Sequence, residues 1–332
     1  MSAAERPPLS SKAEGVATGA TALLALLNVA PLLAWVFGLG AFSTWFVRLT
    51  VPALLGLVVI AVVAFTRPAF ERLRMVFVIG AMGGLLGTIG YDLFRVPFVM
   101  AGREVLAPIE SYGVLLLNAP ASSGLSSFSG WTYHVANGIC FGIAYAAVML
   151  GRSIGWAVVW ALVLETATVV TPFATYYHLR GKWDVIAIAY AAHIPYGLLL
   201  GWVTRRPRTT YDALQETGRW VVPAILGVTV LALAGWLRPW SADVSTTGFD
   251  VGSGRFEPRW VRVAPGDCVK VSNTGDEALT LQGTPTPTAV PVDGTARVCL
   301  TEPGVTRLGV AGRAWSGGYV IVDPQASPGG GT

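Results

Sequence analysis

Long apolar blocks alternate with short polar loops over the first 240 residues of the chain. Each block is long enough to cross a hydrocarbon core of about 30 Å as a helix that rises about 1.5 Å per residue. This pattern predicts a mainly α-helical, multi-pass membrane domain at residues 16–240 that follows a polar cytoplasmic tail, 1–15. Seven spans are expected, at about 16–39, 46–66, 74–99, 130–150, 154–176, 184–203 and 219–238.

The pattern changes at about Ser241, where short alternating apolar and polar runs replace the blocks. Pro-Gly and Asn-Thr-Gly turns separate these runs, as expected for strands of a small all-β sandwich at residues 241–325. The Gly-rich tail 326–332 is predicted to be disordered. The clearest runs are Trp260–Val263, Cys268–Ser272, Ala296–Leu300 and Tyr319–Val322.

Basic residues gather in alternate loops, which predicts the orientation of the chain. Short loops rich in Lys and Arg stay in the cytoplasm. The N-terminus is therefore expected on the cytoplasmic side of the cell membrane and the β domain on the outer side. Arg180 and Lys182 depart mildly from this pattern. The residues that set this orientation are Arg67, Arg72, Arg74, Arg152, Arg205, Arg206, Arg208 and Arg219.

The net charge of +4 does not indicate a nucleic-acid partner. Residues 241–332 hold seven Lys or Arg and nine Asp or Glu, so the positive excess belongs to the membrane half. The cytoplasmic loops account for it, and no basic stripe with interleaved aromatic residues is present. The expected partner is the lipid bilayer.

The same alternation places two cysteines on one face of the β domain. Val269 and Val298 would point inward, so Cys268 and Cys299 would point outward on neighbouring strands. Disulfides persist outside the cytoplasm. We therefore expect a disulfide between Cys268 and Cys299, whereas Cys140, within the fourth span, is interpreted as a small buried apolar residue.

Several motifs in residues 249–323 resemble a cupredoxin. They are Phe256-Glu257-Pro258, Val263-Ala264-Pro265-Gly266-Asp267-Cys268-Val269, Ser272-Asn273, Glu302-Pro303-Gly304 and Gly318-Tyr319-Val320-Ile321-Val322. The resemblance implies a cupredoxin-like β sandwich. It would serve either as a binding module for an extracytoplasmic protein partner or as a rigid cap over the membrane domain.

The copper ligands of that family are missing. Blue-copper sites use two His, one Cys and a weak axial ligand, and this domain contains no histidine. The first His would fall near Leu279–Leu281, and the positions of the Cys, second His and Met carry Val310, Arg313 and Ser316. A blue-copper centre is therefore excluded.

All three histidines, His134, His178 and His193, lie in or at the ends of apolar blocks. Ionisable residues are costly in a bilayer, and those found there usually line a site. We estimate that Asp92 and His134 lie about 24–27 Å, and Glu165 and His193 about 15–17 Å, from the cytoplasmic ends of their helices. Two tiers of ionisable side chains are expected, reached from outside.

Imidazole with carboxylate suits Zn, Cu or Fe. The primary hypothesis is therefore a transition-metal or haem b site for metal handling or redox work. Its candidate ligands are Asp92, His134, Glu165 and His193, each from a different helix, and its supporting residues are Arg95, Asn137, His178 and Tyr196.

Three other functions stay open. A non-enzymatic anchor would present the β domain, and a proton relay would use the two tiers. A metal-dependent membrane hydrolase would place Asp92, His134 and His193 around zinc. The outer segment 101–129 is expected to form either a re-entrant piece or a lid over the membrane site. No phosphate-binding loop, HExxH motif or nucleophile elbow is present, so whether the chain is an enzyme is not predicted.

Two further features concern the helices themselves. Glycines with small-xxx-small spacing predict close packing between the third and fourth spans, and Pro172 and Pro195 are expected to open their helices. The glycines are Gly80, Gly83, Gly84, Gly87 and Gly90 in one span and Gly138 and Gly142 in the other.

Overall fold

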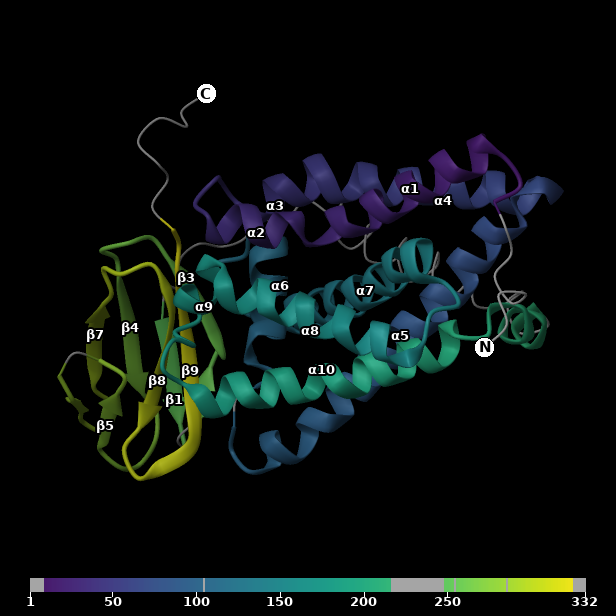
Figure 1. Cartoon of the computed structure of the whole chain (residues 1–332). Coiled ribbons are helices and arrows are strands. Elements are labelled where there is room, and N and C mark those ends of the chain that lie inside the picture. The colour runs from purple at the N-terminus through teal and green to yellow at the C-terminus, as the bar shows by residue number, and fades with distance from the viewer. Residues whose placement is uncertain (1–8, 104, 216–247, 254, 285, 325–332) are drawn as a thin grey trace.

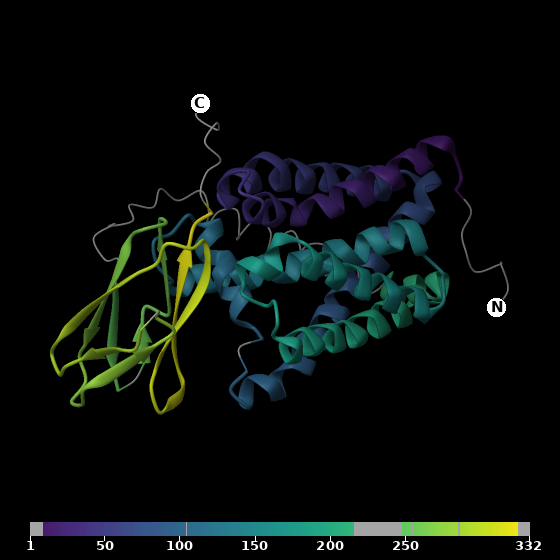
Figure 2. The same ribbon diagram turned by 60° about the vertical axis from the view of Figure 1, so that its left-hand side comes forward.

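The computed structural model describes residues 9–103, 105–215, 248–253, 255–284 and 286–324. Long helices run side by side, and a β domain lies at one end of them (Figure 1). The same arrangement is seen after a 60° turn (Figure 2). The predicted seventh span, 219–238, the start of the β domain at 241–247 and the whole tail 326–332 lie outside the described residues, as do residues 1–8.

The helices follow the predicted apolar blocks closely. They are α1 (Lys12–Leu26), η2 (Leu27–Val29), α2 (Ala30–Val36), α3 (Phe42–Trp45), η3 (Phe46–Thr50), α4 (Val51–Thr66), η4 (Pro68–Phe70), α5 (Glu71–Met100), α6 (Ala107–Leu116), α7 (Gly124–Met149), α8 (Ile154–Val170), α9 (Pro172–Tyr176) and α10 (Trp183–Thr204).

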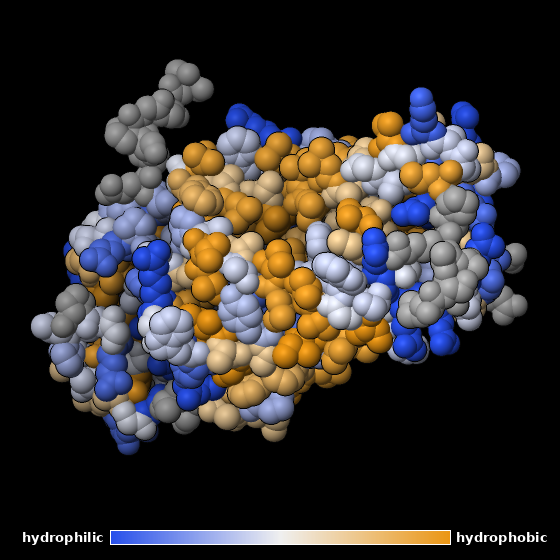
Figure 3. Space-filling model, viewed as in Figure 1, coloured by the Kyte–Doolittle hydropathy of each residue, from blue (hydrophilic) through white to orange (hydrophobic). Residues whose placement is uncertain are grey.

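Four described stretches are long and apolar enough to cross a membrane: Lys12–Val36, Phe42–Thr66, Pro68–Met100 and Trp183–Thr204. Apolar side chains cover much of the visible surface of the helices (Figure 3). The chain is therefore a membrane protein, although fewer spans are shown than the seven predicted. α7 has the length of a span but begins with polar residues, and α8 has only 17 residues.

The first helix begins earlier than predicted. Ser11 caps α1 by accepting a hydrogen bond from the backbone N–H of Glu14, so helix starts at Lys12 inside the expected polar tail. Glu14 is fully buried and accepts a hydrogen bond from the backbone N–H of Leu73 at 3.1 Å. A carboxylate at the start of α5 accepts a hydrogen bond from an otherwise unpaired helix N–H group, and its negative charge interacts favourably with the helix dipole.

Glycines bring α5 and α7 into backbone contact, as their spacing predicted. A Cβ atom on Gly142 would collide with the carbonyl oxygen of Gly80 and the Cα atom of Gly84. A Cβ atom on Gly84 would meet the carbonyl oxygen of Gly138. These two helices therefore form a fixed pair.

Two irregular turns interrupt the first two apolar stretches. Pro31 has no N–H to offer the carbonyl of Leu27, and the chain forms the 3₁₀ turn η2 there. Pro52 follows the π-helical turn η3 in the same way. Farther along, Pro172 separates α8 from α9, as predicted, whereas α10 continues through Pro195.

The β domain consists of two sheets with strand orders β2-β1-β4-β7 and β3-β9-β8-β5-β6. Apolar side chains from both sheets form one core. The strands are β1 (Gly248–Gly252), β2 (Arg255–Glu257), β3 (Trp260–Val263), β4 (Cys268–Asn273), β5 (Leu279–Gln282), β6 (Thr288–Val290), β7 (Thr295–Cys299), β8 (Gly304–Val310) and β9 (Arg313–Val322).

The predicted disulfide is confirmed. Cys268 on β4 lies directly opposite Cys299 on β7, and the two are bonded. Val269 and Val298 point into the core, as the alternation required. The third cysteine, Cys140, is free and buried.

The β domain is joined to the helices by main-chain and side-chain contacts. Residues 120–122 run along the edge strand β3, where Arg262 N–H donates to the carbonyl of Pro120 at 2.7 Å and Ser122 N–H donates to that of Trp260 at 2.8 Å. Glu110 on α6 accepts hydrogen bonds from the Trp260 indole at 2.9 Å and from Arg259 at 2.8 Å. The β domain and the helices therefore share an interface with specific hydrogen bonds.

Candidate functional site

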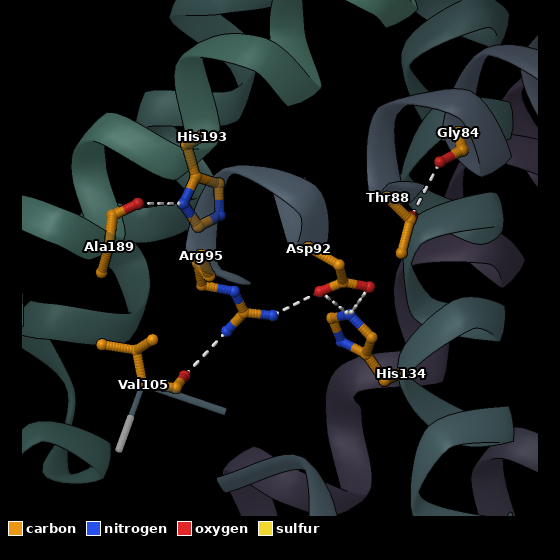
Figure 4. Close-up of polar contacts among 8 residues, drawn as sticks. All are labelled: Gly84, Thr88, Asp92, Arg95, Val105, His134, Ala189 and His193. Carbon is orange, nitrogen blue, oxygen red and sulfur yellow. Dashed lines mark hydrogen bonds and ion pairs between the residues drawn. The ribbon is translucent and has the colours of Figure 1, made fainter. Parts of the chain in front are cut away.

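An ionisable network lies where α5 meets α7 (Figure 4). Both carboxylate oxygens of Asp92 contact Nε2 of His134, at 3.0 and 3.1 Å. Arg95 donates to Asp92 at 2.5 Å and to the backbone carbonyl of Val105 at 2.9 Å. Arg95 is only 5% exposed, so the carboxylate of Asp92 compensates a buried guanidinium charge.

A second pair joins α8 to α10. Nδ1 of His193 lies 2.9 Å from the carbonyl oxygen of Ala189 and 3.5 Å from Oε2 of Glu165. A neutral His193 that donates from Nδ1 leaves Nε2 as an acceptor. Glu165 is 5% exposed, so the imidazole is the polar group that accompanies a buried carboxyl.

The ring of Tyr91 on α5 links the two pairs. Its centroid lies 6.0 Å from that of His134 and 4.7 Å from that of His193. The guanidinium carbon of Arg95 lies 3.9 Å from the Tyr91 centroid, a cation–π contact. Figure 4 shows Arg95 between the two imidazoles. We call these six residues, Tyr91, Asp92, Arg95, His134, Glu165 and His193, the ionisable cluster.

The cluster is closed on the side away from the β domain. There the same helices carry apolar side chains that belong to one core, including Val76 and Ile79 on α5 and Ala144 and Ala147 on α7. Side-chain exposure is 21% at Asp92 and 15% at both histidines, against 7% at Glu165. The cluster is therefore partly accessible at Asp92, His134 and His193, and least so at Glu165.

Three supporting residues lie elsewhere. Asn137 accepts a hydrogen bond from Asn28 at 2.8 Å, on the α1 side of α7. The hydroxyl of Tyr196 donates to the carbonyl of Gly138 at 2.8 Å, which is a packing contact between α10 and α7. His178 follows α9 and lies against Gly304 of the β domain. None of these described contacts involves a member of the ionisable cluster.

The cluster does not fit a metal centre with three protein ligands. Among the described residues, no group of three or more His, Cys, Asp or Glu side chains is placed to hold a metal ion. Asp92 is already bound by Arg95, whose fixed charge opposes a bound cation. For the predicted haem, the ring of Tyr91 lies against both imidazoles that would be the axial ligands.

Sequence reasoning overlooked two residues. No role was predicted for Tyr91, and its contacts with both histidines follow from the packing of α5 against α7 and α10. Asn28 was missed altogether, although a lone amide in an apolar block, three residues before Pro31, was an available signal. It is 1% exposed.

No family model and no curated protein matches the chain. The solved structures that are similar to it include the following two. One is a mutant of amicyanin in its reduced Cu(I) form at pH 4, with 15% identity over 24% of this chain and 83% of that chain and a TM-score of 0.22. The other is a heme-copper terminal oxidase dimer, with 14% identity over 32% of this chain and 99% of that chain and a TM-score of 0.20.

The motifs that resemble a cupredoxin lie in a C-terminal domain of two β sheets. At TM-scores this low, neither similarity carries an argument about activity. The positions of the missing copper ligands hold other side chains: Val310 pairs with Leu281 across β8 and β5, and Arg313 forms an ion pair with Glu277 at 2.9 Å.

Proposed function

We propose that this membrane protein takes up and releases protons at the ionisable cluster, in exchange with the side of the membrane that bears the β domain. The observation that carries the proposal is the presence of two imidazole–carboxylate pairs, His134 with Asp92 and His193 with Glu165, on either side of Tyr91.

The chemistry of the pairs supports proton exchange. Histidine is the side chain that normally changes charge near neutral pH. Within the described residues, Nδ1 of His134 and Nε2 of His193 have no hydrogen-bond partner, so each can exchange a proton with water. The carboxylate of Asp92 stabilises an imidazolium that forms at His134, and in the second pair the buried carboxyl of Glu165 can itself carry the proton.

The apolar core on the far side supports one-sided exchange. Toward the start of α8, the buried side chains that precede Glu165 are those of Ala157 and Ala161, which carry no titratable group. The cluster would therefore load and unload from one face, as a half-channel, and would not conduct protons across the bilayer.

The test is infrared difference spectroscopy on proteoliposomes after a pH jump confined to one side. We expect a buried carboxyl band that responds quickly to the pH on the β-domain side, and that Glu165→Gln removes it. Asp184→Asn is the matched control, because Asp184 is about half exposed and pairs with Arg103 at the surface. A carboxyl band that ignores the pH on that side, or that survives Glu165→Gln, would refute the proposal.

A non-enzymatic anchor is the second candidate, favoured by the way the network satisfies itself through Arg95, Asp92 and His134. In that case His193→Ala would lower the melting temperature, but the variant would take up as many protons per protein as the wild type. Proton uptake by pH-stat titration separates the two functions, since only the proton proposal predicts a smaller uptake in a folded variant.

The transition-metal or haem site stays a prediction from the sequence. Elemental analysis of the purified protein, with its visible absorption spectrum, tests it directly. The arrangement of Asp92 and Arg95 leads us to expect a colourless protein without stoichiometric Zn, Cu or Fe.

A further inference from the structure

The two irregular turns η2 and η3 face each other. The hydroxyl of Thr50, at the end of η3, donates to the carbonyl of Leu27, at the start of η2, with a distance of 3.4 Å. Non-helical backbone at membrane depth occurs where it is buried in protein or lines a site. Two such breaks in contact therefore mark a place where the bundle interior is polar.

Buried amides and hydroxyls collect at this place. Asn28 is 1%, Thr50 0% and Asn137 9% exposed. The amide nitrogen of Asn28 donates to Oδ1 of Asn137 at 2.8 Å, and the hydroxyl of Tyr133 donates to the carbonyl of Asn28 at 2.9 Å. We call Asn28, Thr50, Tyr133 and Asn137 the amide cluster.

One acceptor in the amide cluster is unmatched. Among the described residues, Oδ1 of Asn28 has no hydrogen-bond partner although the atom is fully buried. A buried acceptor without a partner is costly, and native proteins normally satisfy it with a protein group, a water molecule or an ion. Asn28 Oδ1 can therefore accept a hydrogen bond or bind an ion.

The chemistry of the groups around Asn28 Oδ1 indicates which kind of ligand they would bind. All are neutral oxygens from amides, hydroxyls and backbone carbonyls, and no carboxylate or imidazole belongs to the set. Hard cations prefer oxygen ligands, and neutral carbonyl oxygens can replace the hydration shell of an alkali ion. A divalent or transition metal would require charged or softer ligands.

We propose that the amide cluster binds one monovalent cation, Na⁺ or K⁺, with Asn28 Oδ1 as a ligand. Broken helices that offer carbonyl oxygens are how membrane proteins hold such ions. The site is distinct from the ionisable cluster, although Asn137 and His134 lie one turn apart on α7. The proposal does not rest on the proton function.

The surroundings would keep the bound ion dehydrated. The rings of Phe42, Phe46 and Tyr112 pack around Tyr133, with centroids 5.3, 6.1 and 5.7 Å away. Phe42 is 1% exposed. An ion held beneath these rings is screened weakly from its ligands, which strengthens each ion–oxygen contact.

The test measures the melting temperature of the full-length protein in detergent as NaCl or KCl replaces choline chloride at constant ionic strength. We expect a saturable rise of a few degrees, because a ligand that binds only the folded state stabilises it. Asn28→Ala should abolish the rise. Thr21→Val is the control that should retain it, since Thr21 is equally buried in α1 but donates to its own helix.

Direct binding keeps the proposal testable if Asn28→Ala does not fold. Radioactive Na⁺ should bind the wild-type protein with a stoichiometry of one and be displaced by K⁺ or unlabelled Na⁺ but not by choline. Equal melting temperatures in all three salts would indicate that only a water molecule completes the cluster and would overturn the proposal. A cation effect of the same size in Asn28→Ala would do so as well.

Discussion

Helical spacing predicted which residues share a depth but not always which residues touch. Asp92 and His134 form the pair expected from their positions, as do Glu165 and His193. Asn137, three residues after His134, contacts Asn28 instead, because residues three apart on a helix differ by about 60° in direction. α7 lies between α5 and α1, so that rotation changes the partner.

The glycines of α5 and α7 give a prediction at this scale. Gly142→Ala should destabilise the protein by about 1–3 kcal/mol, because the added methyl group meets backbone atoms that cannot rotate away. Gly19→Ala, on α1, should be neutral or slightly stabilising, because open space surrounds that position. Unfolding in mixed micelles compares the two variants, and equal stabilities would contradict the close packing.

At the scale of elements, the sequence predicted the β strands well because their alternation and turns are local signals. The register of Cys268 opposite Cys299 followed from which valines must face the core. The breaks η2 and η3 were not foreseen, although Pro31 and Pro52 stand in apolar blocks. Local rules say that proline interrupts a helix, but the type of turn depends on the helix packed opposite.

The disulfide gives the prediction for these elements. Replacing both Cys268 and Cys299 with Ser should lower the stability of the β domain by about 2–4 kcal/mol, since the bond closes a loop with a sequence separation of 31. Chemical denaturation followed by tryptophan fluorescence measures the loss. Cys140→Ala is the control. The intact mass of this variant should still rise by two hydrogens on reduction, because the disulfide does not involve Cys140.

For the whole molecule, composition and block length were enough to predict a membrane protein with a β domain at its C-terminal end. They did not predict how the two halves join, because Glu110 and Trp260 are far apart in sequence and neither belongs to a motif. The ionisable cluster was foreseen only as residues of similar depth. The apolar core that closes the cluster on the side away from the β domain depends on packing between helices, which the pattern of a single helix does not reveal.

Orientation is the prediction for the whole chain. Alkaline phosphatase, which needs its own disulfides, should be active when fused after Asp323 and inactive when fused after Arg205, because we expect the two positions on opposite sides of the membrane. A cytoplasmic reporter such as green fluorescent protein should give the reverse pattern. The same result from both fusion sites would contradict the orientation.

The short pairing of residues 120–122 with β3 has a consequence for where this protein can be divided. β3 is an edge strand, and unpaired strand edges invite aggregation. The membrane half supplies the backbone that shields this edge and the carboxylate that receives the Trp260 indole. A fragment that begins at the composition change near Ser241 would leave the β3 edge exposed and prone to aggregation. The unit that folds and the unit that the sequence delimits are different pieces of chain.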